Sequence, residues 1–315
     1  MAVLLCDRSD WGVIEVADAD RLAFLHNQST NTFQQRRPGE GCDTVFVTAT
    51  GRMIDLATVL VRPDACWLLV SPQRRAELLT RLDKYIFFSD RVQLRDRSAD
   101  LAVLSLMGAD ADNLIEQLAA VSPSGWTAGE HHTISLDGVE VELQRGSGLT
   151  EPGLTLVLPR AQREAIATQL MDAGAVAADW NDLRLRQGRP AADAEITEDY
   201  NPLEAGLWDC IRFDKGCYIG QETIARLNTY QGVKQRLLGL RAEASLTVGT
   251  ALTTPTGEKA GRITSVSGDG CFALAYVRTV AGDSGSTVLA DSVPATVVDL
   301  PYIRHEYWQS PAPKG

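Results

Sequence analysis

The sequence predicts an α+β protein with a small all-β unit at its C-terminal end. Strand-like and helix-like segments mix without a regular βαβ rhythm, which favours α+β over a doubly wound parallel sheet. From about Lys234, short strands separated by glycines indicate a small antiparallel barrel or sandwich of about 70 residues. The length of 315 residues predicts two or three domains.

Each element is predicted from its hydrophobic period. Alternating or continuous apolar runs predict strands at residues 12–16, 43–48, 56–61, 66–70, 101–107, 133–144 and 155–158. Apolar residues at helical spacing predict helices at residues 73–87, 161–173 and 179–187. In the C-terminal unit, strands are expected at residues 237–240, 262–267, 272–276 and 295–300, followed by a disordered tail at 309–315.

A short internal similarity suggests two related strand–helix units. The sequence Ala-Asp-Ala-Asp follows the first predicted strand at residues 17–20 and occurs again at residues 109–112, after the strand at 101–107. In both copies an Asp occupies the position of a helix N-cap. Because Ala and Asp are common in this chain, a chance match is the alternative.

Composition and charge exclude several classes of protein. With 44% hydrophobic and 23% charged residues the chain is not broadly disordered, and no apolar run approaches the ~20 residues of a membrane span. A net charge of −11 opposes direct binding to nucleic acid or to anionic membranes. The basic stretch from Arg74 to Arg97 contains interleaved acids, so a solvated amphipathic face is favoured over a polyanion site.

The cysteines are expected to be reduced thiols. The chain has six of them, none in a C-x-x-C pair, and its first residues show no secretion signal. No spacing of Cys and His resembles a zinc site, so no bound metal is predicted.

The segment from Glu195 to Arg226 concentrates residues that a simple core does not need. Within it, Cys217 lies two residues after Lys215, and Gly220 precedes a predicted short helix. A nearby ammonium group and a helix N-terminus both favour a thiolate, and amides freed by glycines can hold an anion. The alternative is a buried structural cysteine in a tight turn.

The eight residues KGCYIGQE at 215–222 resemble the K-G-C-Y-x-G-Q-E signature of the YgfZ-type folate-binding proteins, which are related to the aminomethyltransferase (T protein) of the glycine cleavage system. Weaker matches follow in family order at residues 24–31, 50–55, 201–207, 261–265 and 273–278. The resemblance implies two related α+β subdomains around a central folate-binding channel. It places them at residues 1–233, with a boundary near residue 100, and a β-barrel at residues 234–308.

The resemblance also implies a ligand and roles for individual residues. Tetrahydrofolate is the implied cofactor. Cys217 would act as a reactive thiol, and Lys215 would stabilise its thiolate or bind an anionic folate tail. The implied folate-site residues are Asn31, Asp55, Arg145, Glu204, Gly216, Tyr218, Gly220, Gln221, Glu222 and Arg226.

Four of these residues are also compatible with a second role. Packing is favoured for Tyr218. Helix capping is favoured for Gln221 and Glu222 over a salt bridge to Arg226. For Asp55 the alternative is an exposed turn acid.

Three functions are compatible with the resemblance. The first is an accessory role in assembly or repair of iron–sulfur proteins, including a radical enzyme that thiomethylates tRNA. Its partners would be those clients or assembly factors, and the protein would be a monomer in a bacterial cytoplasm. The second is a tetrahydrofolate-dependent aminomethyltransferase, and the third is a pure binding protein in which Cys217 is structural.

Three departures from the T-protein pattern favour the first function. T proteins carry a catalytic acid at the position of Leu56, and leucine cannot accept a proton. They also carry a folate-contacting tyrosine and glutamate where this chain has Gly148 and Thr155, and they lack a cysteine at the position of Cys217. The chain thus resembles aminomethyltransferases but lacks the acid that their reaction requires.

Overall fold

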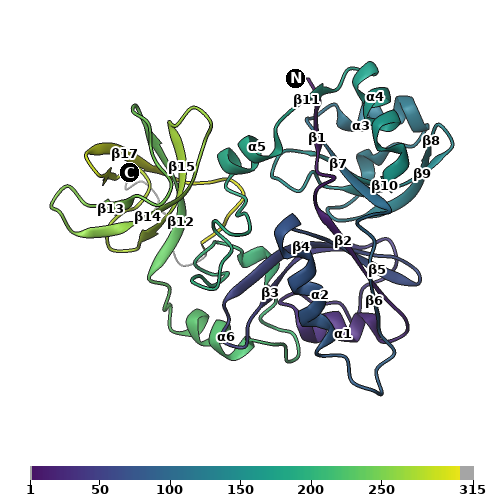
Figure 1. The fold of residues 1–315 in the computed structure, drawn as a ribbon, viewed down its shortest axis with the longest axis horizontal. Coiled ribbons are helices and arrows are strands. Elements are labelled where there is room, and N and C mark those ends of the chain that lie inside the picture. The colour runs from purple at the N-terminus through teal and green to yellow at the C-terminus, as the bar shows by residue number, and fades with distance from the viewer. Residues whose placement is uncertain (1, 306–315) are drawn as a thin grey trace. The chain divides into compact units, whose positions relative to one another are not determined.

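A computed structural model describes residues 2–305 and divides into two compact units (Figure 1). The first unit contains residues 1–46 and 55–180, and the second contains residues 47–54 and 181–315. The predicted boundaries near residue 100 and at residue 233 stay predictions, and the predicted tail at 309–315 lies outside the described residues.

Two sheets form the body of the first unit. Their strand orders are β3-β4-β5-β2-β6 and β11-β1-β7-β10-β9-β8. The first sheet contains β2 (Gly12–Ala17), β3 (Gly41–Val47), β4 (Met53–Val61), β5 (Ala65–Val70) and β6 (Gln93–Asp96). The second contains β1 (Leu4–Asp7), β7 (Leu101–Met107), β8 (His131–Leu136), β9 (Val139–Arg145), β10 (Gly153–Pro159) and β11 (Val176–Ala177).

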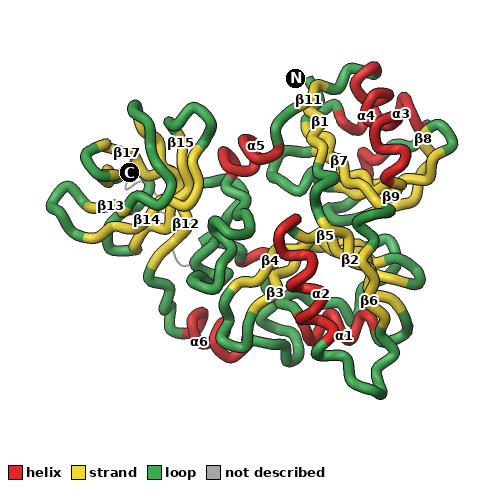
Figure 2. Tube along the Cα trace, viewed as in Figure 1, coloured by secondary structure: helices red, strands yellow, loops and turns green. Residues whose placement is uncertain are grey.

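The helices follow the same strands in both sheets (Figure 2). They are α1 (Arg21–Gln28) after β2, α2 (Arg75–Asp83) after β5, α3 (Ala111–Ala119) after β7 and α4 (Arg163–Asp172) after β10. Short 3-10 helices occur at Pro72–Arg74, Pro123–Gly125 and Arg160–Gln162. Each half therefore repeats the order strand, helix, three strands, helix, which confirms the prediction of two related α+β subdomains.

The structure corrects the register of the internal similarity. Asp20 and Asp110, ninety positions apart, are the N-cap residues of α1 and α3, with φ/ψ of −94/5° and −92/5°. Leu25 and Ile115, also ninety positions apart, are fully buried. The predicted alignment paired Asp20 with Asp112 and was wrong by two residues, because an Ala-Asp-Ala-Asp stretch matches itself after a shift of two.

Three other expectations about the first unit differ from the structure. The segment at 133–144 is a hairpin, with Asp137 and Gly138 at φ of 49° and 80° in its two-residue turn. The helix after β5 ends at Asp83, where the helical hydrogen bonds are replaced by i→i−3 bonds from Tyr85 N–H to Leu82 at 3.0 Å and from Ile86 N–H to Asp83 at 3.2 Å. The strands β1 and β6 were not predicted; each has only four residues.

A closed β-barrel dominates the second unit. Its strand order is β12-β15-β14-β13-β16-β17, which confirms the predicted antiparallel unit as a barrel and not a sandwich. The strands are β12 (Gln235–Ala242), β13 (Ala251–Thr253), β14 (Lys259–Val266), β15 (Phe272–Arg278), β16 (Thr287–Ala290) and β17 (Val293–Val298). Before the barrel come α5 (Trp180–Gln187), a 3-10 helix (Trp208–Cys210) and α6 (Gln221–Thr229).

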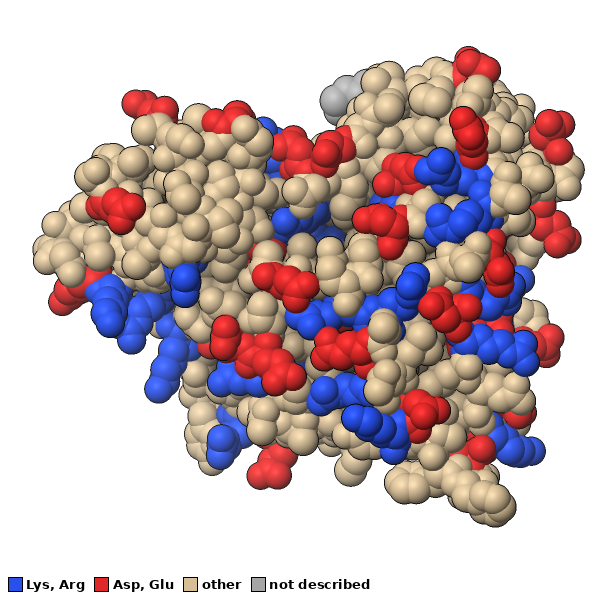
Figure 3. Space-filling model, in the orientation of Figure 1, with Lys and Arg blue, Asp and Glu red and all other residues tan. Residues whose placement is uncertain are grey.

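Charged side chains of both signs alternate on the surface. Figure 3 shows Lys and Arg interspersed with Asp and Glu on the face drawn. Within the basic stretch, Arg74 pairs with Glu77 at 2.7 Å and Arg75 with Asp96 at 3.1 Å, which favours the solvated face over a polyanion site. Within residues 2–305, none of the helices combines the length and the apolar character that a bilayer crossing requires.

Candidate functional site

The loop before α6 exposes the cysteine of the signature. Cys217 is exposed, whereas the neighbouring Tyr218 is buried, and burial raises the pKa of that phenol to about 12. The Lys215 ammonium lies 4.8 Å from the centre of the Tyr218 ring. Tyr218 therefore packs under the loop, and the Cys217 sulfur is not buried as a structural cysteine would be.

Two signature residues give this loop its shape. Gly220 is the N-cap of α6 at φ +81°, and a Cβ there would lie 2.5 Å from the Thr48 carbonyl oxygen, so only glycine fits. The Gln221 side-chain amide donates to the carbonyl oxygens of Lys215 and Gly216 at 3.4 and 3.5 Å. Gln221 thus holds the Cys217 loop. The favoured capping role is wrong for Gln221 and Glu222, because neither side chain accepts from an N–H group of the first turn of α6 in the described chain.

Gly216, Glu222 and Arg226 are the remaining predicted residues of the Cys217 loop and α6. Gly216 contributes its carbonyl oxygen to the contact with Gln221. Glu222 and Arg226 are exposed on α6, and no ion pair joins them in the part of the chain that the structure describes. Their side chains are free to meet a ligand or partner from solvent.

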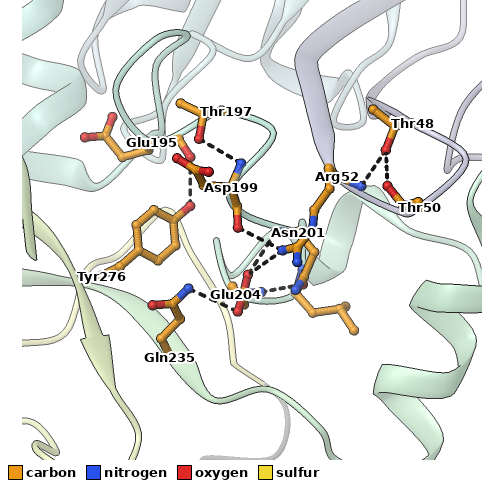
Figure 4. A network of polar contacts seen from close by, with 11 residues as sticks. Thr48, Thr50, Arg52, Glu195, Thr197, Asp199, Asn201, Glu204, Gln235 and Tyr276 are labelled. Carbon is orange, nitrogen blue, oxygen red and sulfur yellow. Dashed lines mark hydrogen bonds and ion pairs between the residues drawn. The ribbon is translucent and has the colours of Figure 1, made fainter. Parts of the chain in front are cut away.

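The sequence Asn-Pro-Leu-Glu at 201–204 forms a reciprocal cap (Figure 4). The Asn201 side-chain oxygen accepts from the backbone N–H groups of Leu203 and Glu204 at 3.0 Å. In return, the Glu204 carboxylate accepts from Asn201 N–H at 3.0 Å. The hydrogen bonds between Asn201 and Glu204 therefore explain why the turn contains these two residue types, and they fix the direction of the Glu204 side chain.

The tip of the β3–β4 hairpin reaches the same turn. Arg52 donates to the Asp199 carbonyl oxygen at 2.8 Å and lies 3.8 Å from the Glu204 carboxylate (Figure 4). Gln235 donates to the other oxygen of Glu204 at 3.2 Å. Burial raises the pKa of Glu204 above its ordinary value of 4.5, against the lowering effect of the Asn201 N–H and of Gln235.

This raised pKa gives a prediction for pH dependence. The folded protein binds the Glu204 proton more tightly than the unfolded chain, so the stabilisation is present below pH 4.5 and is lost as pH rises through the raised pKa. We expect the wild type to lose unfolding free energy relative to the Glu204→Gln variant between pH 4 and pH 7. Urea unfolding of both proteins across that range measures the difference. A difference independent of pH would contradict the assignment.

A buried ion pair joins the segment before the motif to the barrel. The Glu195 carboxylate is fully buried and accepts from Arg184 at 2.9 Å and from Thr264 and Ser265 at 2.6 Å each. The Tyr276 hydroxyl donates to the Glu195 carbonyl oxygen at 2.8 Å (Figure 4). Sequence reasoning missed Glu195, because its hydroxyl partners Thr264 and Ser265 come from the barrel, about seventy positions further along the chain.

Two predicted folate residues of the first unit are buried among local partners. Asn31 donates from its side-chain amide to the Asp43 carbonyl oxygen at 2.8 Å. Asp55 is fully buried, and its two oxygens accept from the backbone and the hydroxyl of Ser71 at 2.9 and 2.6 Å. The alternative of an exposed turn acid is therefore wrong for Asp55, which holds the start of the 3-10 helix after β5. Leu56, next to it, is also buried.

Arg145 is the predicted residue of the first unit that best suits an anionic ligand. One terminal nitrogen of its guanidinium pairs with Asp112 at 2.5 Å. Its remaining side-chain nitrogens make no hydrogen bond to any residue between 2 and 305, and the side chain is 23% exposed. An unused edge of a guanidinium suits a carboxylate such as the glutamyl group of folate.

The neighbouring loop explains the loss of the T-protein tyrosine. Gly148 has φ +84°, and a Cβ there would lie 2.8 Å from an Arg8 nitrogen and 3.0 Å from Trp180. The Arg8 guanidinium lies 3.9 and 4.0 Å from the ring centres of Trp11 and Trp180, whose planes meet at 85°. These three side chains fill the space next to the loop. No sequence signal identified them, because Arg8 and Trp180 lie at opposite ends of the first unit's sequence.

The predicted site residues are divided between the two units. Asn31, Asp55 and Arg145 lie in the first unit, and Glu204 and the residues 215–226 lie in the second. Within the second unit, the hairpin tip, the turn at 201–204 and the loop of Cys217 come together. Among the described residues, no three His, Cys, Asp or Glu side chains form a group suited to a metal ion.

The comparisons with known proteins agree with this geometry. Residues 1–215 match the model of the GCVT N-terminal domain, and residues 234–302 match that of the CAF17 C-terminal β-barrel domain. A candidate chloroplastic transferase of Arabidopsis thaliana is 37% identical over 97% of this chain and 72% of its own length. The aminomethyltransferase of Thermus thermophilus is 26% identical over 96% of this chain and 87% of its own.

The fold is also that of a solved structure. The glycine cleavage system aminomethyltransferase T of Bartonella henselae superimposes with a TM-score of 0.83 at 18% identity, over 96% of this chain and 87% of that one. These similarities confirm the resemblance that the signature indicated and the predicted fold class.

Proposed function

Because the chain belongs to the GCVT N-terminal domain family and carries a CAF17-type C-terminal β-barrel, we propose that it is a tetrahydrofolate-binding accessory protein of the YgfZ/CAF17 type. Its role is to support assembly or repair of iron–sulfur proteins, including a tRNA-thiomethylating radical enzyme, in the cytoplasm. The observation that supports it best is the exposed Cys217 in a loop held by Gln221 and Gly220.

The residues present suit folate in part. Arg145 has unused N–H groups for a carboxylate of the ligand. Asn31 and Asp55 have side chains that already bind their own neighbours, so their contribution is to shape the protein around the ligand. Bound folate would supply its one-carbon or redox chemistry, and Cys217 would present the thiol.

Arg145→Met tests the folate part of the proposal. Loss of a charge-assisted hydrogen bond is expected to weaken tetrahydrofolate binding about tenfold or more, measured by anaerobic calorimetry. Arg163→Met is the matched control, because Arg163 pairs on the surface with Asp7 at 2.7 Å in the same unit. No binding to the wild type, or equal loss in both variants, would refute the folate assignment.

Cys217→Ser tests the accessory role. In a strain that lacks the protein, the variant is expected to restore little iron–sulfur enzyme activity under oxidative stress. Cys271→Ser, at a partly exposed cysteine of the barrel, is expected to restore it fully. Full rescue by Cys217→Ser would remove the thiol from the mechanism and leave a binding protein.

The second candidate is an aminomethyltransferase, which the names of several relatives favour. Against it, Leu56 is buried where the acid is required, and the Asp55 carboxylate is held by Ser71. Purified protein with tetrahydrofolate and an aminomethylated H-protein distinguishes the two. Formation of methylene-tetrahydrofolate would establish the transferase.

A further inference from the structure

Two turns of the first unit are copies of each other. Residues 37–40 precede β3 and residues 127–130 precede β8, ninety positions apart. In the first, Arg37 N–H donates to the Glu40 carboxylate at 3.1 Å. In the second, Thr127 N–H donates to the Glu130 carboxylate at 2.9 Å. Both turns contain a glycine of positive φ, Gly39 at 92° and Gly129 at 82°.

The backbone contacts of the two turns are also equivalent. Gly39 N–H donates to Val61 at the end of β4, and Gly129 N–H donates to Arg145 at the end of β9, at 2.9 and 3.0 Å. The turns touch each other, because His131 N–H donates to the Gly39 carbonyl oxygen at 2.8 Å. The internal repeat therefore brings two related glutamates to one place.

A pocket of about 400 Å³ lies between these turns. The residues that line it include Arg36, Pro38, Glu40, Thr127, Ala128, Glu130 and His132. A volume of this size is within the range of small-molecule sites. None of these residues belongs to the predicted folate site.

The two glutamates differ in how many of their carboxylate oxygens already accept a hydrogen bond. Both oxygens of Glu130 are occupied, one by Thr127 and the other by His132 at 3.0 Å, and the hydrogen bond from His132 lowers the pKa of Glu130 to about 2. Glu40 uses one oxygen in its turn, and the other has no hydrogen-bond partner within residues 2–305. The pocket therefore offers one unused carboxylate oxygen.

The opposite charge is offered by Arg36. Its Nε donates to the Thr32 carbonyl oxygen at 2.9 Å and one terminal nitrogen to Gly41 at 3.3 Å. The other terminal nitrogen makes no hydrogen bond in the described chain. A ligand with only a positive or only a negative charge would be repelled by one of these two side chains. A ligand that carries both charges can pair its cation with Glu40 and its anion with Arg36.

We propose that this pocket binds a free α-amino acid, with the ammonium group at the Glu40 carboxylate and the carboxylate at the Arg36 guanidinium. A guanidinium edge suits a carboxylate, and a carboxylate accepts from an ammonium group. The site is independent of the proposed folate role, so either proposal can fail alone.

Calorimetry with three matched probes tests the ligand class. L-Alanine carries both charges, ethylamine only the ammonium group, and propionate only the carboxylate. We expect L-alanine to bind the wild type at least about tenfold more tightly than either single-charge probe. No binding of L-alanine up to ~10 mM, or equal binding of ethylamine, would overturn the proposal.

The repeat provides a matched pair of variants. Glu40→Gln and Glu130→Gln both keep an acceptor oxygen for the N–H that closes their turn. Glu130→Gln also loses the ion pair with His132, so its thermal unfolding should shift at least as much as that of Glu40→Gln. Only Glu40→Gln is expected to weaken L-alanine binding, by about tenfold or more, because Glu130 has no oxygen free for the ligand. Equal weakening in both would show that the turns, and not a contact with Glu40, govern binding, and would refute the assignment.

Discussion

Replacement of Gly220 by alanine is expected to lower the unfolding free energy by about 3 kcal/mol. The new Cβ would meet the Thr48 carbonyl oxygen at 2.5 Å and the Val47 side chain at 2.9 Å, and the residue would be at φ +81°. A backbone oxygen cannot move aside as a flexible side chain can. The hairpin tip and the start of α6 must therefore separate.

Gly257→Ala is the control for backbone strain alone. Gly257 lies in the same unit at φ +88°, but nothing approaches its Cβ position within 4 Å. Its cost is expected to be about 1 kcal/mol, from the left-handed conformation only. Urea unfolding gives both values, and the alkylation rate of Cys217 reports the loop. Equal costs in the two variants would mean that Gly220 is not packed against the hairpin.

Arg184→Met is expected to cost about 3–5 kcal/mol, because it leaves the Glu195 carboxylate buried without its cation. Thr264 and Ser265 would still donate to Glu195, but neither carries charge. Urea unfolding measures the loss.

Arg186→Met on the same helix is the comparison. Arg186 pairs with Asp182 and Asp269 at 2.9 and 3.0 Å, but its side chain is 45% exposed, so water screens the pairs and the expected cost is below about 1 kcal/mol. Similar costs for the two variants would show that burial does not govern the Arg184 pair.

The fold was largely predictable because hydrophobic period and turn residues are local. The runs at 101–107 and 272–276 are strands of nearly those bounds, and the glycine-rich end of the chain is a barrel. The short strands β1 and β6 escaped prediction, since four residues give too few repeats to show a period. β1 completes the sheet of the second half by pairing with β7, a long-range contact that no local pattern encodes.

The candidate site was predictable only where a motif has a local cause. The reciprocal cap of Asn201 and Glu204 and the glycine at 220 are such cases. Asp55 looked like a turn acid because it follows Gly51 closely, but it lies inside β4 and its partner Ser71 comes from beyond β5. The role of Gln221 also depends on the path of the preceding loop, which the residue types do not specify.

The hairpin tip at residues 47–54 belongs to the unit formed mostly by residues 181–315. On the ribosome this tip is therefore made early, and α6, whose Thr223 packs against Gly51, is complete only after Thr229 has been added. At about 5–20 residues per second, the hairpin tip remains without its contact to α6 for on the order of 10–40 s. Nascent chains stalled before α6 should consequently be cut by protease at the tip, and completed chains should resist.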